Sequence, residues 1–234
     1  MMAMNLVLFG SGEFTPEVND IDEYLISKYK PRSVAILPTA AGAEPDASKW
    51  IAMAQAHYQK YNLEVLPIPV FDKAQANQKE LISPLKQADW IFFSGGNPGY
   101  LLEVLKGSEL WKIVLKRLEA GALLLGSSAG AMVMGKYLLS PSFNPTDERS
   151  GRIWQNAFGL VDYSIIPHFD HFKKHKGFMR NVLRMSLSRV RSSWMGIDEN
   201  TAIIFSNLEP IVRGLGGVEI HNSTDTFHLT KDNT

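Results

Sequence analysis

The chain has 234 residues, of which 45% are hydrophobic and 21% are charged, as in an ordinary globular protein. Lys plus Arg and Asp plus Glu number 24 each, so no overall charge favours nucleic acid or an anionic membrane surface as a partner. The sequence contains no cysteine, which excludes disulfides, thiolate nucleophiles and cysteine-based metal sites.

The N-terminal segment indicates a cytoplasmic protein. It has no basic region, and its apolar run Leu6–Phe9 is too short for a signal peptide. No stretch approaches the length of a membrane span. We therefore expect a cytoplasmic protein with a single domain over residues 1–234.

Short apolar runs alternate with longer amphipathic ones. This alternation predicts an α/β fold with three layers, in which a mostly parallel sheet is flanked by helices. The predicted strands are Leu6–Phe9, Ser33–Leu37, Glu64–Pro67, Trp90–Phe93, Ala122–Leu125, Tyr163–Ile166, Ala202–Phe205 and Glu219–Ile220. The predicted helices are Glu17–Lys28, Ala47–Lys60, Lys79–Gln87, Pro98–Leu105 and Glu109–Glu119.

In two segments the apolar residues show no regular helical or strand spacing. Ser140–Gly159 contains two prolines and several polar residues, and ordered loops of that length are often functional. The tail from Ser223 onward is polar and is expected to fray.

The most informative motif is Gly126-Ser127-Ser128-Ala129-Gly130, which follows an apolar run directly. Gly-x-Ser-x-Gly between a strand and a helix is typical of a nucleophile elbow, a sharp turn that exposes a serine hydroxyl. Glycines at both ends let strand and helix approach closely, because they have no Cβ. The motif predicts a serine hydrolase in which Ser128 is the nucleophile.

A serine hydrolase needs two N–H donors for the oxyanion, and the N–H of Ala129, after the nucleophile, is one candidate. The second is expected from Gly95-Gly96, which follows the strand Trp90–Phe93. A plain turn before a helix at Pro98 is the alternative for that loop. Gly10-Ser11-Gly12 lacks the third glycine of a dinucleotide-binding loop, so a tight turn beside the active site is favoured there.

Three of the six histidines cluster at His168, His171 and His175. His168 follows a predicted strand and Pro167, so we expect it at the carboxyl edge of the sheet as the general base, with His171 as the second candidate. The cluster could instead bind a metal, but its His-x-x-His spacing does not suit one face of a helix, and no matching carboxylate pair is evident.

The carboxylate that orients the histidine is expected between serine and histidine in the chain. Asp147 and Glu148, in the long loop after the elbow, are the candidates. Asp162 is less attractive because it lies in a predicted strand. An α/β-hydrolase shares this order, but its histidine normally comes much later in the chain.

These residues together resemble a family of serine peptidases that includes dipeptidase E (aspartyl dipeptidase) and cyanophycinase. The resemblance covers nearly the whole chain, and its combined motifs are specific although each is weak alone. It rests on Ile36-Leu37-Pro38-Thr39-Ala40, Ser94-Gly95-Gly96-Asn97, Gly126-Ser127-Ser128-Ala129-Gly130-Ala131, Pro167-His168-Phe169, His175-Lys176-Gly177 and Gly196-Ile197-Asp198-Glu199-Asn200-Thr201-Ala202.

The resemblance implies a fold like that of class I glutamine amidotransferases, which is flavodoxin-like, and a metal-free triad of serine, histidine and a carboxylate. By position, Ser128 would be the nucleophile and His168 the base, and Gly96 and Ala129 would supply the oxyanion hole. The match does not decide between Asp147 and Glu148.

The family's preference is for aspartyl peptides, so a basic side chain would bind the acidic group of the substrate. Arg149, Arg152 and Arg180 are candidates, and we expect Asn97, His171 and Arg180 to contact the substrate. The segment after His168 spaces His171-Phe172 as cyanophycinase does.

The sequence and the resemblance thus predict a cytoplasmic serine peptidase for small aspartyl peptides, with no cofactor and acting as a monomer or homodimer. The alternative is an inactive binding or regulatory module of the same fold. A glutamine amidotransferase is close to excluded, because no cysteine is present to form a thioester.

Overall fold

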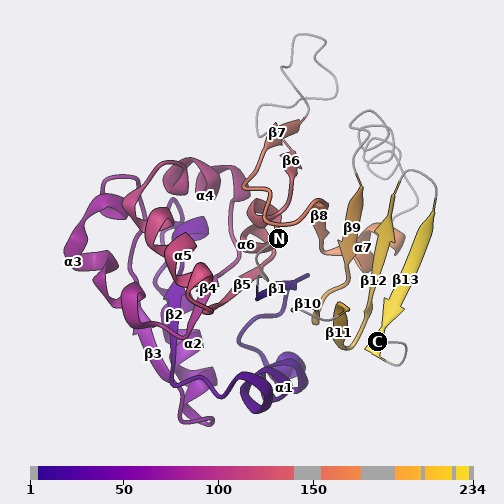
Figure 1. Ribbon diagram of the computed structural model, residues 1–234, viewed down its shortest axis with the longest axis horizontal. Helices are drawn as coiled ribbons and strands as arrows, with labels where there is room; N and C mark the ends of the chain where they lie inside the picture. Colours follow the sequence, from indigo (N-terminus) through magenta and orange to yellow (C-terminus); the bar gives the residue numbers. More distant parts are fainter. Residues whose placement is uncertain (1–4, 140–153, 175–192, 207–208, 223–224, 232–234) are drawn as a thin grey trace.

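The computed structural model of the protein describes residues 5–139, 154–174, 193–206, 209–222 and 225–231 (Figure 1). It shows one large sheet that carries helices on both faces, and a second, smaller sheet beside it. Within the described residues, no helix is both long and apolar enough to span a membrane.

The large sheet has seven strands in the order β11-β10-β1-β5-β4-β2-β3. Five neighbouring strands, β1, β5, β4, β2 and β3, pair in parallel. Strands β10 and β11 extend the sheet beyond β1 by antiparallel pairing. The strands are β1 (Leu6–Phe9), β2 (Ser33–Leu37), β3 (Glu64–Pro67), β4 (Trp90–Phe93), β5 (Leu123–Ser127), β10 (Thr201–Phe205) and β11 (Ile211–Gly214). The expected mostly parallel α/β sheet is confirmed.

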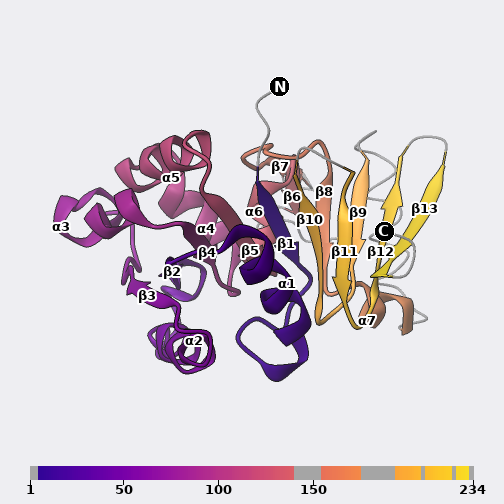
Figure 2. The ribbon, with the colours of Figure 1, turned by 60° about the horizontal axis from the view of Figure 1, so that its bottom comes forward.

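Both faces of this sheet are buried, which explains why its strands are apolar at successive positions rather than at alternate ones. In β1, Leu6 and Leu8 enter one hydrophobic cluster, whereas Val7 and Phe9 enter the other. Figure 2 shows helices above and below the central strands. The second cluster is covered by α1 (Asn19–Tyr29) and α2 (Lys49–Gln59), and the first by α3 (Lys79–Ile82), α4 (Pro98–Leu105), α5 (Glu109–Glu119) and α6 (Ala129–Met134).

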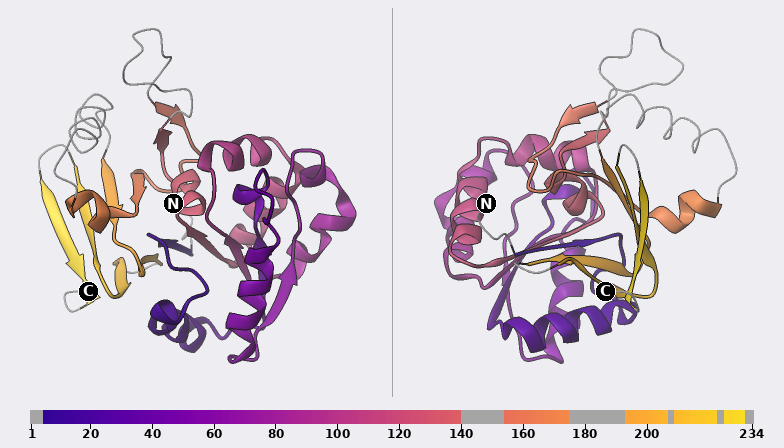
Figure 3. Two further views of the ribbon diagram at one scale, coloured as in Figure 1. Left: turned by 180° about the vertical axis from the view of Figure 1, so that it is seen from behind. Right: turned by 45° about the vertical axis from the view of Figure 1, so that its right-hand side comes forward.

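The smaller sheet has four strands in the order β13-β12-β9-β8 and lies beside the β10–β11 edge of the large one (Figure 3). Its strands are β8 (Ser164–Pro167), β9 (Trp194–Ile197), β12 (Gly217–His221) and β13 (Thr226–Thr230), and α7 (Phe169–Lys174) follows β8. Only β8 and β9 are parallel. The predicted strands Tyr163–Ile166 and Glu219–Ile220, which correspond to β8 and β12, were expected in the single sheet, and β9 and β13 were not predicted as strands; the second sheet corrects both points.

The predicted elements of the first half match closely. Pro98–Leu105 and Glu109–Glu119 are helices with the predicted bounds, and Asn97 and Ser108 cap them by accepting backbone N–H groups. The predicted helix Lys79–Gln87 is interrupted: its second half, Ser83–Gln87, is a 3₁₀ helix. Proline at position 84 has no N–H for an α-helical hydrogen bond, which explains the change.

Two segments expected to lack regular structure contain strands. Trp154–Asn156 forms β7, which pairs antiparallel with β6 (Tyr137–Leu139). Thr226–Thr230 forms β13, which pairs with β12 through a turn in which the Asn222 N–H donates to the Asp225 carbonyl. The expectation of a frayed tail from Ser223 is therefore wrong for this stretch, because pairing with β12 provides hydrogen-bond partners for a polar strand.

Candidate active site

Ser128 lies at the apex of a sharp turn between β5 and α6. Its backbone has φ 49° and ψ −108°, a left-handed conformation that is strained for a residue with a Cβ. Its N–H donates to the Phe9 carbonyl at 3.2 Å, which fixes the turn to the end of β1. The serine side chain is therefore presented at the carboxyl edge of the parallel sheet, as the Gly-x-Ser-x-Gly motif predicts.

The two glycines of the motif stand where backbone segments almost touch. A Cβ on Gly130 would lie 2.2 Å from the Phe93 carbonyl oxygen, and one on Gly126 would lie 2.6 Å from the Gly130 carbonyl carbon. Any side chain at either position would push α6 away from β4 and β5. The close approach of strand and helix explains both glycines.

His168 follows β8 and faces Ser128. Its Nε2 lies 2.7 Å from the Ser128 Oγ, a hydrogen-bond distance between residues 40 positions apart. Its backbone also has a positive φ, 148°. The predicted carboxyl edge is that of the second sheet, whose strand β8 packs against α6.

Glu199 holds the other side of the His168 ring, because its Oε1 lies 3.0 Å from His168 Nδ1. Since an ionised carboxylate only accepts hydrogen bonds, His168 Nδ1 carries the proton and Nε2 is free to accept one from Ser128. Ser128, His168 and Glu199 thus form a continuous chain of hydrogen bonds. This is the arrangement by which a histidine takes a proton from a serine hydroxyl.

The strand register explains how Glu199 reaches the histidine. Parallel pairing places Pro167 of β8 opposite Ile197 of β9, so the residues that follow both strands emerge together. The turn that carries Glu199 joins β9 to β10, and it lies tightly on the end of β1. A Cβ on Gly10 would come within 2.1 Å of the Asp198 carbonyl oxygen.

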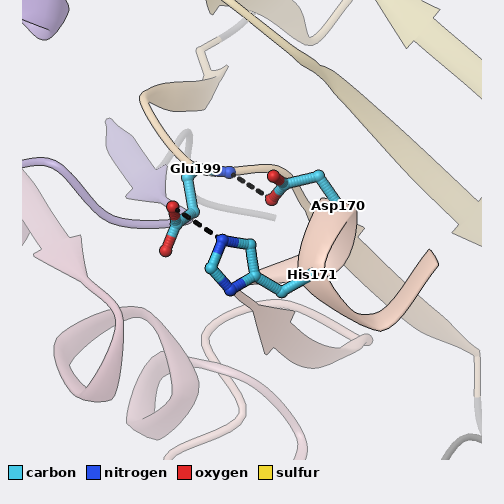
Figure 4. A group of neighbouring side chains, drawn as sticks. All are labelled: Asp170, His171 and Glu199. Carbon is cyan, nitrogen blue, oxygen red and sulfur yellow. Dashed lines mark hydrogen bonds and ion pairs between the residues drawn. The ribbon is translucent and has the colours of Figure 1, made fainter. Parts of the chain in front are cut away.

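Asp170 and His171, near the start of α7, also contact Glu199 (Figure 4). The Glu199 N–H donates to Asp170 Oδ1 at 3.1 Å, and His171 Nε2 lies 3.2 Å from Glu199 Oε2. Each carboxylate oxygen of Glu199 therefore has one histidine partner. His171 contacts the carboxylate, whereas His168 contacts the Ser128 Oγ, so the geometry favours His168 over His171 as the base.

The pKa of Asp170 is lowered. Burial alone would raise it, but the hydrogen bonds from the Glu199 N–H and Lys174, with the charge of His171, outweigh burial. Asp170 therefore stays ionised to a lower pH than an ordinary aspartate and continues to accept the hydrogen bond from the Glu199 backbone N–H.

Asp170, His171 and Glu199 are also a group whose spacing could hold a metal ion, with ligand atoms within 4.8 Å of one another. In this arrangement Glu199 already accepts from both histidines, and Asp170 already accepts from Glu199. A metal would have to displace these hydrogen bonds, including the one that orients His168. The geometry therefore suits proton transfer better than metal binding.

One predicted oxyanion donor, Ala129, is next to Ser128 in the chain, and the loop that carries the other, Gly96, approaches the serine through Gly95. Ala129 is the first residue of α6, directly after the serine. Gly95 approaches from the β4 side: a Cβ placed on it would lie 3.5 Å from the Ser128 Cβ. Gly96 follows it with φ 140°, and a Cβ there would lie 2.5 Å from the Ala40 carbonyl, so only glycine fits this position.

The remaining predicted residues fall into two groups. Asn97 is exposed, and its Oδ1 caps α4 by accepting the Tyr100 N–H at 3.0 Å. Asp162 pairs with Lys136 at 2.5 Å. The others lie outside the described residues: Asp147, Glu148, Arg149, Arg152, His175 and Arg180.

Sequence reasoning missed Glu199 because it sought a carboxylate between Ser128 and His168. A signal was present: Asp198-Glu199 directly follows the apolar strand Trp194–Ile197, so it reaches a carboxyl edge as His168 does. That segment was noted only for its likeness to cyanophycinase.

Comparison with known proteins shows the family of this chain. The family model for peptidase family S51 matches residues 6–211. The family match supports a serine peptidase, and the mostly parallel α/β sheet is the fold on which the site stands. The chain belongs to peptidase family S51.

Individual relatives are similar over most of the chain. A crystal structure of a peptidase from an acI-B1 actinobacterium is 26% identical, with a TM-score of 0.81 over 97% of this chain and 95% of that one. A cyanophycinase of Trichormus variabilis is 27% identical over 72% of this chain and 56% of its own length. A peptidase E of Shewanella denitrificans is 23% identical over 86% of this chain and 84% of its own.

Proposed function

We propose that this protein is a serine peptidase that hydrolyses small aspartyl peptides through an acyl-enzyme on Ser128. The observation that carries the proposal is the hydrogen-bonded chain from the Ser128 Oγ through His168 to Glu199, at 2.7 and 3.0 Å. These hydrogen bonds give no support to an inactive binding module, for which a wide separation of serine and histidine would be expected.

In the first step, the Ser128 Oγ attacks the scissile carbonyl carbon while His168 Nε2 takes the hydroxyl proton. The Gly96 and Ala129 N–H groups stabilise the negative charge on the carbonyl oxygen. Glu199 keeps the proton on Nδ1 and stabilises the imidazolium. The C–N bond then breaks as His168 returns its proton to the leaving amine.

In the second step, His168 takes a proton from water, which attacks the acyl-enzyme. The oxygen–carbon bond of the ester breaks, and the proton returns to the Ser128 Oγ. The acid product leaves with the oxygen from water, and the enzyme regains its starting state. No cofactor enters either step.

The aspartyl preference comes from the resemblance to dipeptidase E and cyanophycinase. We assign Asn97 and Arg180 to the substrate: the Asn97 amide NH₂ to a backbone carbonyl, and the Arg180 guanidinium to the acidic side chain. His171 was expected in the same role, and its contact with Glu199 leads us to assign it to the carboxylate instead. A cytoplasmic location, and action as a monomer or homodimer, stay predictions from the sequence.

The test is hydrolysis of a peptide panel by the purified protein: Asp-X dipeptides, β-aspartyl dipeptides, matched Ala-X dipeptides and simple esters. We expect cleavage of one aspartyl class, with a loss of at least about 10⁴-fold in Ser128→Ala. Ser83→Ala is the matched control, since its exposed hydroxyl donates a hydrogen bond to the nearby Glu80 carbonyl at 3.1 Å and lies outside the proposed site.

The outcomes separate the proposals. Full hydrolysis by Ser128→Ala would rule out this serine as the nucleophile. Cleavage of Ala-X as fast as Asp-X would remove the aspartyl preference and keep the peptidase. A wild-type protein that cleaves nothing in the panel would favour the inactive module.

A further inference from the structure

A second carboxylate lies at the same edge of the sheet, and the proposed steps do not use it. Glu13, in the loop after β1, is 5% exposed. Its Oε1 accepts the Gly95 N–H at 2.8 Å, and its Oε2 accepts a short hydrogen bond from the Ser127 hydroxyl. Glu13 therefore connects the loops that follow three neighbouring strands, β1, β4 and β5.

The contact with Gly95 determines which N–H group of the β4 loop can face a substrate. The Gly95 N–H is bound by Glu13, and the Asn97 N–H donates to the Ala40 carbonyl at 2.8 Å. Gly96 lies between these two fixed amides and is exposed. Anchoring both neighbours orients the Gly96 peptide, which the proposed oxyanion hole requires.

The contact with Ser127 fixes the other half of the hole. Ser127 is fully buried and directly precedes the nucleophile, so its hydroxyl holds the turn that carries Ser128 and Ala129. One carboxylate thus binds the Gly95 loop with one oxygen and this turn with the other. The separation between the Gly96 and Ala129 N–H groups depends on that bridge.

We propose that Glu13 is a positioning residue that sets the geometry of the oxyanion hole. The inference rests on the proposed function, because it concerns the same serine. Glu13 has no direct contact with the Ser128 Oγ among the described hydrogen bonds, and a negative charge near a developing oxyanion would oppose the reaction. Its contribution is therefore geometric: it aligns two donors before the substrate arrives.

Two substitutions at Glu13 separate geometry from charge. Glutamine can accept the Gly95 N–H with its Oε1 and donate its amide N–H to the Ser127 Oγ, so Glu13→Gln keeps the bridge. Glu13→Ala removes it. Loss of one oxyanion donor typically lowers kcat by about 10²- to 10³-fold, and a misaligned donor should cost part of that.

We expect Glu13→Ala to lower kcat by about 10- to 100-fold with KM within about threefold, because the hole binds the transition state more strongly than the substrate. Glu13→Gln should restore kcat to within about threefold of the wild type. Active sites are counted by titration with a fluorophosphonate, so that kcat refers to correctly folded protein. The affinity for a peptide boronate, which occupies the hole, should fall in parallel with kcat.

Two controls keep the test decisive. Asp22→Ala removes another buried carboxylate, one that bonds His57 and Tyr58 between α1 and α2, and should lower Tm without changing kcat per titrated site. Ser127→Ala removes only one arm of the bridge and serves where Glu13→Ala does not fold, with an expected loss of about 3- to 10-fold.

Unchanged kcat and boronate affinity in Glu13→Ala would overturn the inference, and so would a Glu13→Gln protein as slow as Glu13→Ala. In either case the wild type still reacts with the fluorophosphonate, and the proposed function stands. A wild type that neither reacts nor hydrolyses would instead mark the failure of the proposed function.

Discussion

The two regions that meet at the candidate site are built in different ways. The serine side consists of β1, β4 and β5, which are parallel neighbours in the large sheet, and Ser128 itself follows β5 directly. The histidine side consists of β8, α7 and the turn between β9 and β10, which combines a parallel pair in the second sheet with an antiparallel strand of the first.

This difference separates local from long-range determinants. The serine turn depends on five consecutive residues, Gly126–Gly130, whose small side chains allow β5 and α6 to pack closely. Glu199 reaches His168 only because β8 and β9 align in one register and β10 returns to the large sheet. The following substitutions test whether the histidine side contributes as much as the serine side.

The largest effect on the histidine side is expected for Glu199→Gln. An amide can donate to His168 Nδ1 and favour the wrong tautomer, which leaves no acceptor at Nε2 for the Ser128 proton. We expect kcat/KM to fall by about 10³- to 10⁴-fold with little change in Tm. Steady-state hydrolysis of the best aspartyl peptide measures it.

Glu219→Gln is the matched control, because Glu219 also pairs with a histidine, His228, at 3.5 Å, but in the β12–β13 hairpin. It should keep full activity. A Glu199→Gln enzyme within tenfold of the wild type would mean that another carboxylate orients His168, and Asp147 and Glu148 would become the candidates again.

A smaller effect is expected for His171→Ala. Glu199 would lose the partner of its Oε2 and would be held less firmly against His168. Because the His171 side chain is 56% exposed, water can partly replace it, and we expect kcat to fall by only about 3- to 10-fold. His228→Ala, which breaks the exposed pair with Glu219, controls for loss of a surface histidine.

A loss above about 100-fold in His171→Ala would contradict this supporting role and would favour His171 as a proton-transferring group. An unchanged pH–rate profile, apart from the lower plateau, is the expected signature of a supporting residue.

The smallest effect concerns pH. The folded protein lowers the pKa of Asp170, so ionised Asp170 stabilises the fold above its unfolded pKa, and this stabilisation disappears as pH falls through the lower folded value. We expect Asp170→Asn to lower Tm at neutral pH and to converge with the wild type once the pH is acidic enough to protonate Asp170 in the folded protein. Thermal unfolding between pH 7 and pH 2 measures the gap, and a gap that widens on acidification would contradict the assignment.

Much of the fold could be predicted from the sequence. The strands β1 to β4 match their predicted bounds. For β1, β2 and β4 the reason is that a strand buried on both faces is a continuous apolar run, and the predicted serine turn is equally local. The second sheet could not be predicted, since β8, β9 and β12 are short and nothing in their composition assigns them to a separate sheet.

Within the site, Ser128 and His168 could be predicted from the sequence because each follows an apolar strand with a recognisable turn signal. Predicting Glu199 would have required knowing which strand lies beside β8. The expected chain order of serine, acid and histidine instead favoured a carboxylate between Ser128 and His168. The role of Glu13 was equally out of reach, because its partners at positions 95 and 127 come together only in the folded sheet.

The central claim is that Ser128, in the turn between β5 and α6, is the nucleophile and that His168 is its general base. The buried neighbour Ser127 does not have this role. Reaction of the wild type with a fluorophosphonate, followed by digestion and mass spectrometric mapping of the adduct, tests it most directly. We expect a single adduct on Ser128 that is absent from Ser128→Ala. An adduct on Ser127, or labelling of Ser128→Ala at the wild-type rate, would contradict it.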